Sequence, residues 1–212
     1  MNHPDPSRYL WWLASRSAGV VALLLVTASV LIGLTMASKL IRRRGVAPVL
    51  VRVHEQTALA GLAAMLIHGV TLLGDQWLKA GVRGITVPFA MPYRPLYTGL
   101  GIIAAYLAGL LGISFYARRK IGPRLWRKAH RATIVVWILG GVHALGSGTD
   151  GHSLWLRVVV LAPVLPIVAL FGIRTVRGRR RAAGRSPRAA QLRAARAGGR
   201  PTPALAGREA GQ

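Results

Sequence analysis

Four histidines fall inside apolar stretches of the chain, where ionisable side chains are rare and usually functional. His54 and His68 are spaced as i and i+14, and His130 and His143 as i and i+13. A neutral imidazole is a common axial ligand of haem iron, which takes one ligand on each face of a flat macrocycle. Two parallel helices that each carry two such histidines could therefore hold two haems, one above the other.

The charged residues indicate where the helices that carry these histidines cross a membrane. Five apolar runs lie between successive charges, at 17–38, 56–74, 95–117, 132–149 and 158–173. A membrane-spanning helix needs about 20 apolar residues, with a range of about 17–25. The fifth run is slightly short and contains two prolines, but it can extend over 153–156 while Arg157 snorkels to the interface. The sequence therefore predicts an all-α polytopic membrane bundle of about five transmembrane helices.

The composition supports this fold class and excludes several others. The chain has 212 residues, of which 52% are hydrophobic and 16% charged, with 29 Lys and Arg against 5 Asp and Glu. Soluble domains carry about 25% charged residues of both signs. The chain has no cysteine, which excludes disulfides, iron–sulfur clusters and thiol catalysis. The few scattered acids form no convincing carboxylate pair, and no catalytic residue is predicted.

The distribution of basic residues predicts the orientation of the bundle. The connections after the first and third runs, together with the carboxyl-terminal tail, hold 23 of the 29 Lys and Arg residues. Because the basic side of a membrane protein is usually cytoplasmic, we expect the N-terminus outside the cytoplasmic membrane and the C-terminus inside. The predicted parts are an extracytoplasmic segment 1–16, a haem-binding bundle 17–173 and a disordered, Arg-rich cytoplasmic tail 174–212. Tryptophans near the predicted span ends suit the membrane interface: Trp11, Trp12, Trp77, Trp126 and Trp155.

The four histidines fall into two pairs according to their depth in the membrane. The second and fourth runs have the same direction, so His54 and His130 share a level near the cytoplasmic side. His68 and His143 share a level about 20 Å further out, at about 1.5 Å per residue. The basic side chain of Arg52 near His54, and of Arg131 next to His130, could neutralise haem propionates.

The i, i+13 spacing of His130 and His143 is a geometric difficulty. On an ideal helix, a step of i to i+14 returns to within about 40° of the starting face, whereas a step of i to i+13 ends about 140° away. Either the helix retwists at Gly140 and Gly141, or the two haems lie on different sides of it.

Other functions remain open from the residues alone. Intramembrane histidines also serve proton paths, non-haem metal sites, transporters and proton channels, and the bundle could instead be a helical anchor for a partner. His3 and His152 lie in outer segments and are expected to be solvated. The basic tail is expected to bind anionic lipid or an acidic electron donor, and no nucleic acid is expected because no aromatic residues interleave its arginines.

Several segments resemble the ferric reductase-like transmembrane family, which includes NADPH oxidases, ferric reductases and the haem-binding membrane subunit of bacterial periplasmic methionine sulfoxide reductase. The resemblance runs from His54 to about Asp150 and is carried by HEQTALAGLAAMLIHGVTLLGD, YRPLYTGLG, RRKIGPRLWRKAHR and HALGSGTD. In this family two helices carry histidine pairs with the same two spacings. The resemblance implies an inner haem b bound by His54 and His130 and an outer one bound by His68 and His143. Some bacterial relatives bind fewer haems, so one haem is the alternative.

The resemblance also implies what must come from other proteins. NADPH oxidases and ferric reductases continue into flavin- and nicotinamide-binding domains, whereas this chain continues into the Arg-rich segment 174–212. We therefore expect the membrane haem subunit of an oxidoreductase, reduced by a quinol or a separate flavoprotein. Its acceptor outside would be a ferric chelate, oxygen or a periplasmic redox partner. The family core usually has six helices, one more than predicted here.

Overall fold

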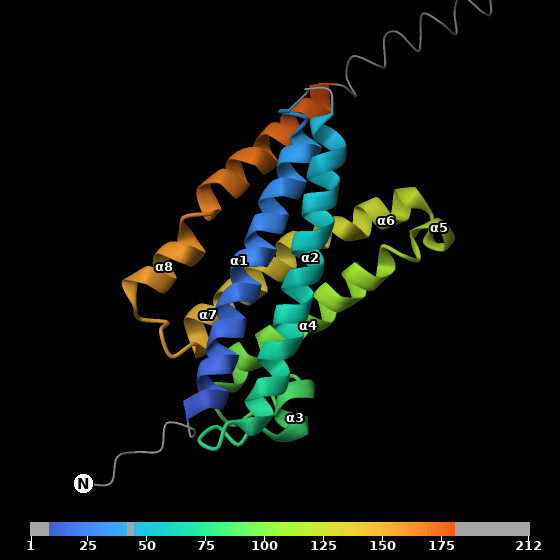
Figure 1. The fold of residues 1–212 in the computed structure, drawn as a ribbon. Coiled ribbons are helices and arrows are strands. Elements are labelled where there is room, and N and C mark those ends of the chain that lie inside the picture. Colours follow the sequence, from blue (N-terminus) through green and yellow to red (C-terminus); the bar gives the residue numbers. More distant parts are fainter. Residues whose placement is uncertain (1–8, 42–44, 181–212) are drawn as a thin grey trace, which may run out of the picture.

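The computed structural model describes residues 9–41 and 45–180, and these form helices joined by short turns and loops (Figure 1). The elements in chain order are α1 (Leu10–Ser38), α2 (Val46–Thr71), η2 (Leu72–Gly74), α3 (Gly81–Thr86), α4 (Pro95–Ser114), α5 (Arg118–Ile121), α6 (Pro123–Ala129), η3 (His130–Ala132), α7 (Thr133–Ser147) and α8 (Leu154–Leu161). Within these residues no strand occurs, and the predicted all-α membrane bundle is confirmed.

Four helices of the described residues are long and apolar enough to cross a membrane: Leu10–Ser38, Val46–Gly74, Pro95–Ser114 and Leu154–Arg180. They correspond to the first, second, third and fifth predicted runs. The fourth run differs, because α7 has only 15 residues. It is preceded directly by the helical turn η3 and by α6, so the helical path through this part of the chain is longer than α7 itself.

The last helix departs from the prediction at its carboxyl end. It begins at Leu154, as the borrowed residues 153–156 suggested, but it continues to Arg180 rather than ending at 173. It is interrupted at Ala162 and Pro163, where α8 as a regular helix ends. Pro163 and Pro166 lack the backbone N–H that an uninterrupted helix needs. Residues 174–180 of the predicted tail are thus helical, and the disorder predicted for the rest of the tail lies outside the described residues, as does His3.

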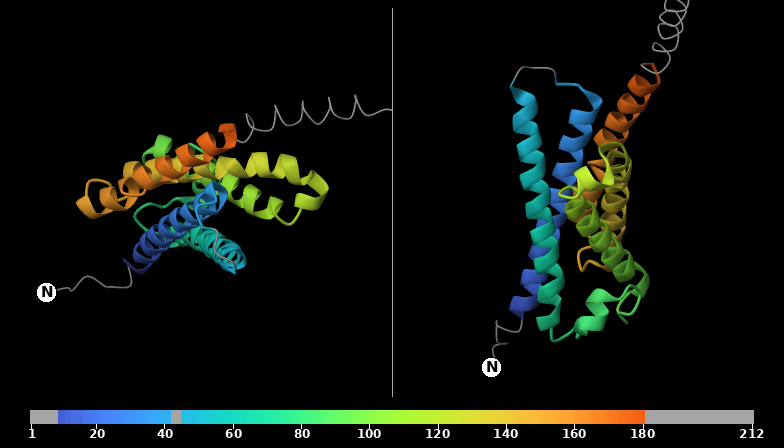
Figure 2. Two further views of the ribbon diagram at one scale, coloured as in Figure 1. Left: turned by 90° about the horizontal axis from the view of Figure 1, so that it is seen from above. Right: turned by 90° about the vertical axis from the view of Figure 1, so that its right-hand side faces the viewer.

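The long helices pack as two pairs, which contact each other through α7 and α1. Helix α1 lies antiparallel to α2, α4 packs on α7, and α7 also contacts α1 (Figures 1 and 2). A buried cluster of Val30, Leu34, Trp137 and Ile167 joins α1, α7 and the last helix. In this core the Trp137 indole N–H donates a hydrogen bond of 2.9 Å to the Thr27 hydroxyl.

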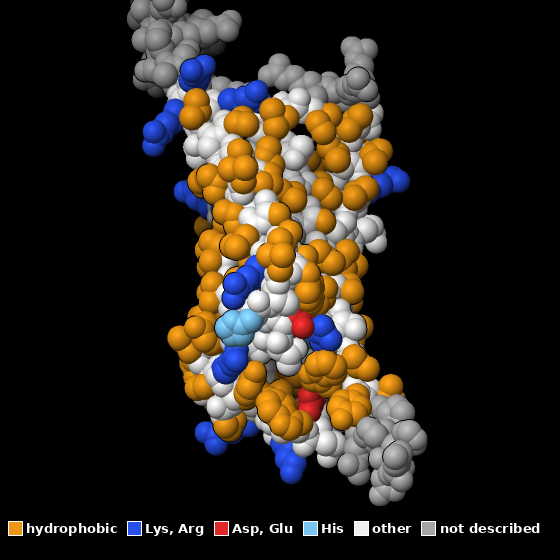
Figure 3. All heavy atoms as spheres, turned by 90° about the vertical axis from the view of Figure 1, so that its left-hand side faces the viewer, with side chains coloured by type: hydrophobic (Ala, Val, Ile, Leu, Met, Phe, Trp, Pro, Cys, Tyr) orange, Lys and Arg blue, Asp and Glu red, His pale blue; other side chains and the backbone are white. Residues whose placement is uncertain are grey.

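Large apolar side chains also cover the outside of the bundle. Leu66, Leu110, Ile113 and Leu165 are between 66% and 78% exposed, and hydrophobic side chains cover much of the face in Figure 3. A soluble monomer rarely exposes apolar surface on this scale, whereas lipid chains would cover it. The protein is therefore a multi-pass membrane protein.

Candidate functional site

The structure brings the four histidines together as two pairs. The ring centroids of His54 and His130 lie 6.1 Å apart with an interplanar angle of 90°. Those of His68 and His143 also lie 6.1 Å apart, with an angle of 73°. In keeping with the predicted orientation, these are called the inner pair and the outer pair.

The outer pair forms despite the i, i+13 spacing on its helix, and η3 accounts for part of the difference in direction between the two histidines of that helix. In a 3₁₀ segment each residue turns about 120° instead of about 100°. The three-residue segment that follows Ala129 reduces the angular offset between His130 and His143 from about 140° to about 80°. Helix α7 runs unbroken through Gly140 and Gly141, so the overwound turn lies at His130 and not at these glycines, where a retwist was one of the two alternatives.

Backbone carbonyls hold three of the four imidazoles by their Nδ1 atoms. The Nδ1–H of His68 donates to the Ser15 carbonyl at 2.8 Å, and that of His54 donates to the Ser29 carbonyl at 3.0 Å. The Nδ1–H of His143 donates to the Tyr97 carbonyl at 2.9 Å. Histidines that bind metals almost always donate their other ring N–H in this way, which fixes the tautomer. The Nε2 atom of each of these three rings therefore carries no proton, and its lone pair is available to bind a metal.

His130 is held differently. Its Nδ1 is buried and has no hydrogen-bond partner among the described residues. The indole of Trp126 stacks on its ring, with centroids 4.9 Å apart and planes 21° apart, and donates its N–H to the Ser114 hydroxyl at 3.2 Å. Trp126, predicted as an interface residue, therefore contacts a candidate ligand directly.

Glycines provide the space that three of the rings occupy. A Cβ atom at Gly101 would lie 2.4 Å from His143 Nδ1, one at Gly19 2.9 Å from His68 Nδ1, and one at Gly33 3.2 Å from His54 Cε1. Ordinary contacts of a Cβ atom begin near 3.4 Å. Larger residues at these positions would displace the imidazoles.

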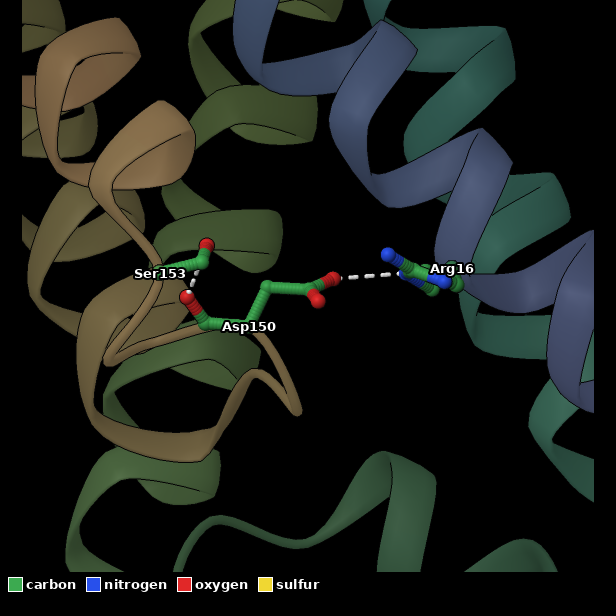
Figure 4. A network of polar contacts seen from close by, with 3 residues as sticks. All are labelled: Arg16, Asp150 and Ser153. Carbon is green, nitrogen blue, oxygen red and sulfur yellow. Dashed lines mark hydrogen bonds and ion pairs between the residues drawn. The ribbon is translucent and has the colours of Figure 1, made fainter.

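A cavity of about 290 Å³ adjoins the outer pair and is lined by both of its histidines together with Ser15, Gly19 and Gly101. At its rim the Arg16 guanidinium forms an ion pair of 2.6 Å with the Asp150 carboxylate (Figure 4). This contact joins α1 to the loop between α7 and α8. The Asp150 carbonyl accepts hydrogen bonds from the Ser153 hydroxyl and backbone N–H, which fix the loop.

The two arginines predicted to accompany the inner pair are both exposed. Arg52 precedes His54 by two positions on α2, and side chains so spaced on a helix point about 160° away from each other. Arg131 lines a second cavity of about 330 Å³ together with Lys39, Arg174 and Arg177. The structure thus places Arg131 in a basic cluster at the inner end and Arg52 on a different face from its histidine.

The chemistry of the donor set limits what the pairs can bind. No group of three or more His, Cys, Asp or Glu residues that could hold a metal ion occurs in the part of the chain that the structure describes. Each level offers two imidazoles only. A metal–imidazole bond of about 2 Å on each side gives a ring-centroid separation of about 6 Å. The pairs therefore suit a metal whose remaining ligands come from a bound organic group rather than from the protein.

A comparison with known protein families shows which family the chain belongs to. The sequence profile described as "Ferric reductase like transmembrane component" matches residues 18–141. The chain belongs to this family. The match includes His54, His68 and His130 and ends just before His143. As a ferric reductase-like transmembrane protein, the chain has a general role in membrane electron transfer. Comparisons with curated proteins and with solved structures gave no match.

The sequence did not lead us to the residues of the ferric reductase-like bundle that accept the Nδ1–H of His54 and His68 or leave space for their rings. Ser15, Gly19, Ser29 and Gly33 all lie on α1, which carries no histidine. A signal was present, because Ser15 and Ser29, like Gly19 and Gly33, are spaced as i and i+14. That spacing is the same as the one between His54 and His68.

Proposed function

We propose that this chain is a haem b-containing electron-transfer protein of the cytoplasmic membrane. His54 and His130 would hold an inner haem, and His68 and His143 an outer haem. The observation that carries the proposal is the equal ring separation of 6.1 Å in two pairs at two levels of one bundle. When bound, each haem supplies an iron centre that accepts and gives one electron at a time.

The protein side chains bind and orient this group. Carbonyls accept the Nδ1–H of His54, His68 and His143, which leaves Nε2 of each ring to bind the metal. Two histidines at each level would supply both of the ligands that the bound group takes from the protein, which would favour electron transfer over binding of oxygen at the metal. Arg131, which directly follows His130 and lies in the basic cluster, is the better placed of the two predicted arginines for a propionate carboxylate.

The bundle would need an electron donor for one of its haems and an electron acceptor at its outer end. We propose a quinol or a separate flavoprotein as the electron donor and an extracytoplasmic acceptor, which makes the chain the membrane subunit of an oxidoreductase. The stretch of α2 between its two histidines rises about 21 Å, so the two stacked pairs provide redox positions at two depths.

The test is the haem content of the purified full chain, measured with a dithionite-reduced minus oxidised spectrum. We expect b-type bands and two haems per chain. The variants His54→Ala and His130→Ala should each lose the inner haem, and His68→Ala and His143→Ala the outer one. His152→Ala is the matched control, because this histidine is exposed and its side chain hydrogen-bonds, among the described residues, with Arg157 at 3.4 Å.

Two outcomes would contradict the proposal. A colourless protein, after haem has been supplied during expression, would exclude haem binding and favour a transporter or proton channel. Full haem content in all four single variants would show that other residues are the ligands.

A further inference from the structure

We infer that α1 sets the position and the donor strength of both histidines of α2 through a repeated Ser-x-x-x-Gly unit. The two units are Ser15 to Gly19 and Ser29 to Gly33. The inference rests on the proposed function, since it concerns the imidazoles as metal ligands. It makes α1 a positioning helix, although α1 contributes no ligand.

The register of the two helices explains the repeat. A step of i to i+14 along an α-helix rises about 21 Å and returns to within about 40° of the starting face. Both units therefore lie along one stripe of α1, and His54 and His68 lie along one stripe of α2. Because the helices are antiparallel, the first unit meets His68 and the second meets His54.

The two units share their contacts with the histidine ring, and the Ser15 hydroxyl in addition donates a hydrogen bond of 3.2 Å to the His68 carbonyl. The serine carbonyl accepts the Nδ1–H, and the serine hydroxyl lies 3.1 Å from the same Nδ1 atom in both units. One helical turn later, the glycine leaves the space that the ring occupies. The carbonyl and hydroxyl fix the direction of the ring, and acceptors on Nδ1–H raise the basicity of a ligating imidazole.

The other two histidines do not depend on α1. His143 is held by the Tyr97 carbonyl of α4 and the Ser147 hydroxyl of its own helix, at 2.9 and 3.0 Å. His130 stacks on Trp126. Helix α1 therefore acts on one ligand of each pair, and the two serines should act on different haems.

The experiment compares Ser15→Ala, Ser29→Ala and the control Ser17→Ala in redox titrations of the full chain. Ser17 lies on the same helix and is exposed. Removing the hydroxyl leaves the backbone carbonyl in place, so the ring keeps one acceptor. Weaker donation from the imidazole makes the ferric form less stable, so the potential of the affected haem should rise.

The expected shift is selective. Loss of a neutral hydrogen bond changes an equilibrium constant by about three- to tenfold, which corresponds to a rise of about 28–59 mV for one electron. Ser15→Ala should shift only the outer haem and Ser29→Ala only the inner one, with Ser17→Ala unchanged. The variants His68→Ala and His54→Ala, each lacking one haem, assign the two potentials.

The outcomes separate this inference from the proposed function. If the wild-type chain binds two haems but neither serine variant shifts a potential, the role of α1 is refuted and haem binding stands. Equal shifts of both haems in either variant would also refute it, because they would indicate a general disturbance. If the wild-type chain binds no haem, both proposals fail together.

Discussion

Gly101 offers the sharpest test of how closely the bundle fits its histidines. It lies on α4 against the ring of His143, and a Cβ atom there would lie 2.4 Å from Nδ1 and 2.6 Å from Cγ. Ordinary contacts of a Cβ atom begin near 3.4 Å, so in Gly101→Ala the ring and the new methyl group must move well apart. The ring is also tied to the Tyr97 carbonyl on the same helix.

This displacement is large compared with what ligation tolerates. Metal–ligand distances in proteins vary by only about 0.2 Å around their usual values. The gap between 2.4 Å and 3.4 Å at Gly101 is several times that range, so the contact of His143 with the outer haem is expected to break. The inner pair lies at the other level and does not touch Gly101, so the haem content should fall from two to one per chain.

The other glycines make a graded series. A Cβ atom would lie 2.9 Å from the His68 ring in Gly19→Ala and 3.2 Å from the His54 ring in Gly33→Ala, so the shift needed to reach 3.4 Å decreases in that order. We expect partial loss of the outer haem in the first variant and retention of the inner haem in the second. Gly109→Ala is the control, because Gly109 lies on the same helix as Gly101, a Cβ atom there meets nothing within 4 Å and the residue does not line the cavity at the outer pair.

The assay is pyridine haemochrome quantification per chain, together with the reduced minus oxidised spectrum and a melting curve. Replacing Gly by Ala in a helix is intrinsically favourable by up to about 1 kcal/mol, so loss of haem with an intact fold is a local effect. If Gly101→Ala retains two haems with an unchanged spectrum, or if Gly33→Ala is the more severe variant, the reasoning from ring contacts is wrong.

Three further predictions concern stability and topology. Thr27→Val leaves the buried indole N–H of Trp137 without its acceptor and should destabilise the protein by about 1–3 kcal/mol, measured by thermal unfolding in detergent. Asp150→Asn removes an ion pair that is partly exposed, so it should cost less than about 1 kcal/mol, with a difference from wild type that shrinks at high salt. Because the chain has no cysteine, Gln76→Cys and Arg124→Cys report topology directly: an impermeant thiol reagent applied from outside should label the first and not the second, and the reverse pattern would refute the predicted orientation.

The sequence predicts where the chain crosses the membrane better than where its helices end. Charged residues mark the borders of the apolar runs, but they do not stop a helix. Helix α2 begins at Val46 and includes Arg52 and Glu55, and the last helix continues to Arg180. The reason is that backbone hydrogen bonds close within a helix whether its side chains contact lipid or water.

The pairing of the histidines was predictable because it depends on depth, which the constant rise per residue of an α-helix fixes. The directions of the rings were not, because they depend on local winding and on neighbouring helices. The overwound segment η3 brings the directions of His130 and His143 about 60° closer than an ideal α-helix would. No glycine or proline marks this turn within 130–132.

The two rings of the inner pair are held in different ways. His130 is the first residue of η3, and its ring direction is set by the stacked indole of Trp126 rather than by a carbonyl that accepts its Nδ1–H, since that atom has no partner among the described residues. His54, across from it, has two acceptors on α1. Since acceptors on Nδ1–H strengthen an imidazole as a metal ligand, His54 would be the stronger and His130 the weaker ligand of the proposed inner haem, while both histidines of the outer pair have acceptors. Histidines at the two levels therefore lie in different environments, and the difference arises from the groups that neighbouring residues place against each ring.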